Sequence, residues 1–199
     1  GAENNRSGTG STNSAIGGGA FNVISNLCLQ STIGGGAVNG IAASVAVIAG
    51  GSGNQIGFSS PCGAIGGGSG NALGTNCQSS TIAGGEVNAI EESFYAFIGG
   101  GWGNRITNHS YSAVIGGGEM NRIGIRARAA VIAGGTSNTI GNYATNATIS
   151  GGKANDIAAD TSYATVGGGQ RNRIAGQSTN SVISGGRNNE VGTGSQDSS

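Results

Sequence analysis

Residues 113–123 read AVIGGGEMNRI, and this pattern of residue types recurs along almost the whole chain of 199 residues. An isoleucine or valine opens each glycine run, and each repeat is numbered from that residue as position 0. The position-0 residues are Ile16, Ile33, Ile48, Ile65, Ile82, Ile98, Ile115, Ile132, Ile149, Val166 and Ile183. They are 17 residues apart except after Ile33, where the spacing is 15, and after Ile82, where it is 16. A short fixed period of this kind predicts a solenoid, here of eleven coils.

Three further positions keep one residue type in all eleven repeats. Positions +2 and +3 are Gly-Gly, and position +8 is Ile, Leu or Val. Position +6 is always asparagine: Asn22, Asn39, Asn54, Asn71, Asn88, Asn104, Asn121, Asn138, Asn155, Asn172 and Asn189. Gly reaches positive φ without strain and Asn bonds neighbouring backbone, so Gly-Gly-x-x-Asn predicts a tight turn. We expect the asparagines to stack into a structural ladder of amide hydrogen bonds.

The residues before position 0 alternate with the period of two that is typical of a strand, since position −2 is always Gly, Ala or Ser. A helix is disfavoured because each Gly costs about 1 kcal/mol relative to Ala. The aliphatic residues at positions 0 and +8 are expected to face each other across a thin interior. The sequence therefore predicts an all-β fold, a β-solenoid or β-roll of eleven two-sided coils over residues 13–192. Residues 1–12 are expected to be a lead-in and 193–199 a flexible tail.

Composition and charge exclude several classes of protein. Nine basic and nine acidic residues give no net charge, so nucleic acid and anionic membrane surfaces are poor partners. No run approaches the roughly 18 apolar residues of a membrane helix, so direct membrane insertion is not expected. One proline and paired glycines exclude collagen.

Each coil has only two large apolar side chains for its interior, which favours burial of further surface between parallel copies. Position −1 is unusually apolar for an outward strand position, and we interpret it as a subunit seam; an ordinary exposed β-face is the alternative. Its residues are Ala15, Thr32, Val47, Ala64, Thr81, Phe97, Val114, Val131, Thr148, Thr165 and Val182.

The segments Asn13–Gly18 and Asn180–Gly185 resemble the Ser-x-Ala-Ile-Gly strands of YadA-like head repeats in trimeric autotransporter adhesins. The full unit, as in Tyr163–Asn172, is also similar to the Gly-Gly-x-x-Asn repeats of bacterial surface proteins and of phage or viral fibres. The resemblance extends from about Asn13 to Gly192. It implies a parallel homotrimer, adhesion, and an extracellular place on a cell or virion surface. The unit here is longer than the YadA-like one.

Residues that could carry chemistry are sparse. His109 is the single histidine, and we interpret it as a solvated loop residue. No Gly run continues into the Gly-Lys-Ser/Thr and helix of a phosphate loop, and no Asp follows Gly-Gly at the spacing of calcium repeats. The sequence therefore predicts no catalytic residue, no metal site and no cofactor.

Two groups of residues remain as candidates. Exposed aromatic residues with arginines nearby are typical of glycan or protein recognition, so a receptor contact is predicted at Trp102, Arg105, His109, Tyr111 and Arg122. The alternative is that these side chains cover loop backbone or pack between subunits. Cys62 and Cys77 lie in successive loops, and a disulfide between them is feasible if their Cα atoms are within about 7 Å.

The leading interpretation is a structural and adhesive rod, a segment of a surface fibre or adhesin that presents loops to a surface glycan or protein receptor. Ice binding is the alternative, since a flat face with regular Thr orders water, although position −1 holds Thr in only four of eleven repeats. A polysaccharide-active β-helix enzyme is less favoured because the acidic residues are scattered.

Overall fold

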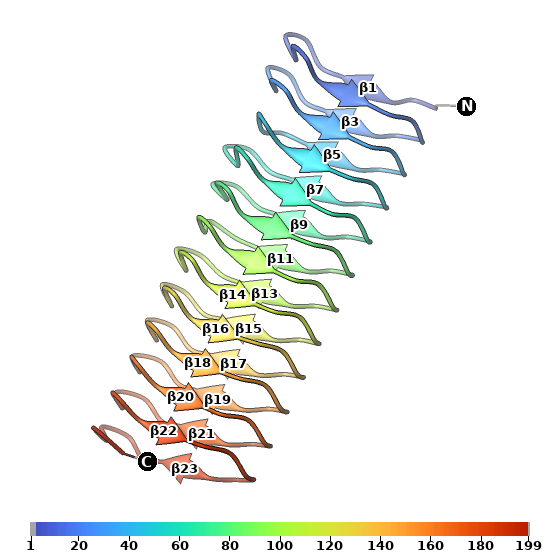
Figure 1. The fold of residues 1–199 in the computed structure, drawn as a ribbon. Helices are drawn as coiled ribbons and strands as arrows, with labels where there is room; N and C mark the ends of the chain where they lie inside the picture. The colour runs from blue at the N-terminus through green and yellow to red at the C-terminus, as the bar shows by residue number, and fades with distance from the viewer. Residues whose placement is uncertain (1–2, 199) are drawn as a thin grey trace.

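The computed structural model describes residues 3–198, which wind into one column of stacked coils (Figure 1). Each full coil contributes two strands of two residues, and every strand pairs in parallel with its equivalents in the neighbouring coils. Residues 3–198 contain no helix. The prediction of an all-β parallel solenoid of about eleven coils is confirmed.

The odd-numbered strands form a 12-stranded parallel sheet, here called the odd sheet. They are β1 (Arg6–Ser7), β3 (Val23–Ile24), β5 (Gly40–Ile41), β7 (Gln55–Ile56), β9 (Ala72–Leu73), β11 (Ala89–Ile90), β13 (Arg105–Ile106), β15 (Arg122–Ile123), β17 (Thr139–Ile140), β19 (Asp156–Ile157), β21 (Arg173–Ile174) and β23 (Glu190–Val191).

The even-numbered strands form an 11-stranded parallel sheet, the even sheet. They are β2 (Ala15–Ile16), β4 (Thr32–Ile33), β6 (Val47–Ile48), β8 (Ala64–Ile65), β10 (Thr81–Ile82), β12 (Phe97–Ile98), β14 (Val114–Ile115), β16 (Val131–Ile132), β18 (Thr148–Ile149), β20 (Thr165–Val166) and β22 (Val182–Ile183).

Residues at position +4 form a third column of parallel pairs, which runs from Glu3 to Arg187. Since equivalent residues pair in every column, side chains of one position lie above one another along the whole rod. Coils about 4.8 Å apart make eleven coils about 50 Å long.

The interior contains the two aliphatic columns that the spacing predicts. The residues at positions 0 and +8 are almost fully buried except near the two ends. Complete burial of such a side chain stabilises the fold by about 2–3 kcal/mol. Small side chains at positions −2 and −5 fill the space beside them, as at Ala113 and Ser110, which are 0% exposed.

The asparagines at position +6 form a continuous column of amide hydrogen bonds. Each backbone N–H donates to Oδ1 of the preceding ladder asparagine at 3.0 Å, as from Asn121 to Asn104. The Nδ2 group of Asn104 donates to Gly100 O at 2.9 Å and to Gly118 O of the next coil at 2.8 Å. Among residues 3–198, no buried side-chain nitrogen or oxygen lacks a partner. The ladder therefore satisfies the polar groups of the Gly-Gly turn.

The second glycine of the pair is required by close contact with the next coil in every coil but the last. Gly118 has φ 90°, and a Cβ on it would lie 2.2 Å from the carbonyl oxygen of Gly135. No side chain fits there unless the coils separate.

Non-glycine residues at three corners adopt positive φ, which the sequence does not indicate. The corners are positions +5, −6 and −3, as at Val87 (φ 56°), His109 (φ 62°) and Tyr95 (φ 57°). Hydrogen bonds between coils hold them there; Tyr95 N, for example, donates to Gln78 O at 3.0 Å.

The solenoid extends beyond the predicted boundaries at both ends. Strand β1 pairs with β3, and Asn5 Oδ1 accepts a hydrogen bond from Asn22 N, so residues 3–12 belong to a coil rather than to a separate lead-in. At the other end Gln196 pairs with Thr179, and residues 193–198 continue the winding that we predicted to end at residue 192.

Candidate functional site

The outer surface of the even sheet is a flat face without charged side chains. Its outward columns are the apolar position −1 and position +1, which is Gly, Ala or Ser in every coil. Position −3, at the edge of this face, also lacks Lys, Arg, Asp, Glu and His. We call positions −3, −1 and +1 the uncharged face. The odd sheet differs, because its outward position +7 includes Arg105, Arg122, Asp156, Arg173 and Glu190.

The five residues of the predicted receptor contact are divided among three columns. Arg105 and Arg122 are neighbours in the odd sheet. Trp102 lies in the third column between Glu86 and Glu119, with its side chain partly exposed. His109 and Tyr111 lie on another edge, at positions −6 and −4, with ring centroids 6.1 Å apart. A single five-residue patch is therefore not formed.

The edge around Tyr111 contains aromatic and charged neighbours beyond the five residues of the predicted receptor contact. The Phe94 ring stacks on Tyr111 at 4.9 Å, and the Arg128 guanidinium lies 5.2 Å from the Tyr111 ring. His109 Nδ1 is 3.9 Å from the Glu92 carboxylate. The sequence does contain a signal for this stack, because Phe94, Tyr111 and Arg128 occupy position −4 in three successive repeats.

Ion pairs cross-link the later coils of the odd sheet. Arg105 pairs with Glu91, and Arg173 contacts both Asp156 at 3.4 Å and Glu190 at 3.1 Å. Burial raises the pKa of the Asp156 carboxyl, and Arg173 partly opposes this shift. These pairs are substantially exposed, so each contributes little to stability.

The disulfide that the loop positions of Cys62 and Cys77 made feasible is not formed, and Cys28, Cys62 and Cys77 are free. Cys77 is buried at position −5, where small side chains face the interior, whereas Cys62 is exposed at the positive-φ corner of position −3. Side chains at these two positions point to opposite sides of the chain. Burial raises the pKa of the Cys28 and Cys77 thiols.

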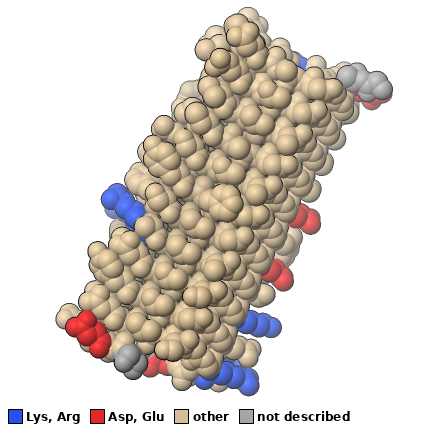
Figure 2. All heavy atoms as spheres, viewed as in Figure 1, with Lys and Arg blue, Asp and Glu red and all other residues tan. Residues whose placement is uncertain are grey.

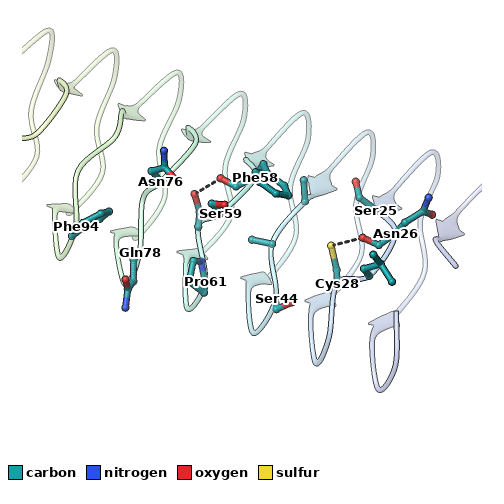
Figure 3. A pocket seen from close by; sticks show the side chains of 14 residues that line it. Ser25, Asn26, Cys28, Ser44, Phe58, Ser59, Pro61, Asn76, Gln78 and Phe94 are labelled. Atoms are coloured by element: carbon teal, nitrogen blue, oxygen red, sulfur yellow. Dashed lines mark hydrogen bonds between the residues drawn. The ribbon is translucent and has the colours of Figure 1, made fainter. Parts of the chain in front are cut away.

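A hollow of about 520 Å³ opens on the edge beside the short coil (Figure 3). Between buried positions +8 and −5 that coil has only Ala42, whereas the neighbouring coils have Ser25 to Leu27 and Gly57 to Ser59. The short coil therefore lacks a corner, and its neighbours border the gap. The sequence analysis missed this site, although the 15-residue spacing after Ile33 signals it.

Among residues 3–198, no three His, Cys, Asp or Glu side chains are grouped as metal ligands. The same range has no helix long and apolar enough to cross a membrane. Comparison with models of known protein families and with curated protein sequences finds no match.

Proposed function

We propose that this chain is a rod segment of an extracellular fibre or adhesin, which associates in parallel with copies of itself and presents its edges to a receptor. The observation that carries the proposal is the uncharged face, which continues through all eleven coils. The resemblance to YadA-like head repeats favours three copies and a surface location.

The regular register supports the mechanical part of the proposal. Every coil is bonded to the next through two sheets, the third column and the asparagine ladder. Bending the column would stretch bonds in several columns at once. A stack of this kind is suited to hold a binding surface at a fixed distance from its anchor.

The uncharged face supports parallel self-association. Parallel copies in register place each column next to the same column of a neighbour, so a charged column would meet like charge. A face about 50 Å long and about 14 Å wide offers about 700 Å² per copy, close to the roughly 800 Å² per partner of a standard interface. Gly, Ala and Ser at position +1 permit close approach of the backbones.

The molar mass in solution, measured by sedimentation velocity, tests this proposal. We expect three times the mass of one chain. Val131→Lys places a charge in the uncharged face and is expected to dissociate the assembly, whereas Thr139→Lys makes the same change on the odd sheet of the same coil and leaves it intact. A wild-type chain that remains monomeric at micromolar concentration would contradict the proposal.

Ice binding is the second candidate, because the uncharged face is flat and carries four threonines at position −1. Thr32, Thr81, Thr148 and Thr165 lie in one column with apolar residues between them. Thermal hysteresis of the purified chain separates the two functions: a monomer that depresses the freezing point supports ice binding, and a trimer without hysteresis supports the rod.

A further inference from the structure

The hollow beside the short coil has the dimensions and lining of a ligand site. Its volume of about 520 Å³ lies within the roughly 300–1,000 Å³ of small-molecule sites. Leu27 and Phe58 stand on its two sides with 75% and 72% of their surface exposed, the highest values among the large hydrophobic residues described. In Figure 3 the Phe58 ring extends from its own coil toward the short coil.

The polar part of the lining is uncharged. Asn26, Asn76 and Gln78 contribute side-chain amides, and Ser44 and Ser59 contribute hydroxyls. The amides of Asn76 and Gln78 are exposed and make no hydrogen bond within residues 3–198. Such groups both donate and accept, which suits hydroxyl groups rather than ions.

A second depression of about 320 Å³ continues the hollow onto the odd sheet, and the two share Ser25 and Ala42. Gly40 has no side chain at outward position +7, and the Gln55 amide lies over it. Phe21 and Val38 border this part. Together the depressions form an open groove across the short coil, with apolar surfaces and free amides in alternation.

We infer that this groove binds a neutral oligosaccharide of two to four sugar units. The apolar face of a pyranose ring packs on Phe58 and Leu27, while its hydroxyl groups bond Asn76, Gln78 and Asn26. No cationic side chain lines either depression, so sialylated, sulfated or phosphorylated ligands gain no charge pairing there. A lipid chain would leave the amides unpaired, which disfavours it.

The site is independent of self-association, because none of the residues that line it belongs to the uncharged face. The lining residues nearest to that face are at position −4: Ser44, Pro61, Gln78 and Phe94. A rod that fails to assemble would therefore keep the groove, and an assembled rod without sugar binding would refute only this inference.

Saturation-transfer NMR of the full chain with chitotriose, cellotriose and lacto-N-tetraose as neutral probes, and 3′-sialyllactose and a heparin tetrasaccharide as anionic probes, tests the inference. We expect transfer to at least one neutral probe and weaker transfer to the anionic ones. Phe58→Ala is expected to weaken binding about tenfold. Ile125→Ala, a change at the same position −7 four coils later, leaves it unchanged.

Filling the groove provides the decisive variant. Insertion of Asn-Gly between Ala42 and Ala43 restores the missing corner without removing any side chain, and we expect it to abolish binding. Insertion of Gly between Ile90 and Glu91 restores the 16-residue coil and serves as the control. No neutral probe bound, preference for an anionic probe, or binding that survives both the insertion and Phe58→Ala would each overturn the inference.

Discussion

Residues 7–85 and residues 86–198 have the same coil and different surfaces. Residues 7–85, the uncharged half, contain no Lys, Arg, Asp, Glu or His, whereas residues 86–198, the charged half, contain eight acidic and eight basic residues. On the face drawn in Figure 2, charged side chains gather toward the C-terminal half of the rod. Both halves expose large apolar residues, so they differ in charge rather than in apolar exposure; those of the uncharged half are Phe21, Val23, Leu27, Leu29, Val38, Val45, Val47 and Phe58.

The comparison separates the residues that specify the fold from those that are free to vary. The asparagine ladder, the Gly-Gly turn and the two aliphatic columns are the same in both halves, so they are sufficient for the coil. Outward positions differ between the halves without changing the register. We therefore expect substitutions of side chains that face the interior to lower the free energy of unfolding equally in the two halves. Substitutions of side chains on the outer surface should have different effects in the two halves.

The largest loss of stability is expected from substitutions in the asparagine ladder. Asn54→Ala and Asn121→Ala each remove side-chain bonds to two glycine carbonyls and leave the next asparagine N–H without its acceptor. The free energy of unfolding in urea should fall by about 3–5 kcal/mol for both variants. Gln78→Ala, at an exposed position outside the positive-φ corners, should change it by less than about 0.5 kcal/mol. Unequal costs for the two ladder variants would show that the halves are not built alike.

A somewhat smaller loss of stability is expected when the second glycine of the Gly-Gly turn is substituted. Gly51 and Gly118 have φ of 89° and 90°, and a Cβ on either would lie within 2.2 Å of a carbonyl oxygen of the next coil. Each Gly→Ala substitution should lower the free energy of unfolding by about 2–4 kcal/mol. Gly84→Ala is the control, because a Cβ there meets nothing within 4 Å. An equal loss at Gly84 would mean that backbone entropy, rather than contact, explains the glycines.

The apolar corners of the uncharged half predict a stabilising substitution. Val38 has φ 60° and its side chain is 53% exposed, so a β-branched residue is strained there without being buried. Val38→Asn should raise the free energy of unfolding by about 1 kcal/mol, whereas Ser137→Asn, at the same position in the charged half, should change it by a few tenths. Loss of stability in Val38→Asn would show that the valine packs on its neighbours.

If that substitution stabilises the chain, stability does not explain the valine at this corner. Val38 borders the groove beside the short coil, as Phe21 does. The strained apolar corner is then better explained by contact with a ligand, which links the stability measurement to the sugar-binding experiment.

The sequence was sufficient to predict every feature that repeats with one residue type. The period, the two strands, the aliphatic columns and the alignment of the asparagines all follow from positions 0, +2, +3, +6 and +8. The positive-φ corners could not be predicted, because residues as different as Val45, Cys62 and Tyr95 occupy position −3. There the bonds between coils override local preference, which is a tertiary effect.

The candidate sites were less accessible to sequence analysis for a related reason. A binding surface on a solenoid arises from residues of one position in successive coils, as in the stack of Phe94, Tyr111 and Arg128. Proximity in the sequence instead suggested grouping Trp102 with Tyr111. The hollow arises because one coil is two residues shorter than the coils on either side. It can be recognised only when the length of that repeat is compared with the lengths of the adjacent repeats.

The smallest expected effect is a pH dependence confined to the charged half. Burial raises the pKa of Asp156 above its ordinary value of 3.8, so the folded chain binds this proton more tightly than the unfolded chain. The stabilisation from this proton is complete below about pH 3.8 and is lost as the pH rises through the folded-state pKa. Asp156→Asn cannot ionise, so its stability relative to wild type should increase between pH 3.5 and pH 6.

Urea unfolding of both proteins across this range measures the difference, and the change should be small because the Asp156 side chain is 40% exposed. Arg173→Ala removes the cation that opposes the shift and should steepen the dependence. If Asp156→Asn instead loses stability relative to wild type as the pH rises, the ion pair outweighs burial. The charged half would then gain a stabilising charge pair that the uncharged half, with no carboxylate, cannot have.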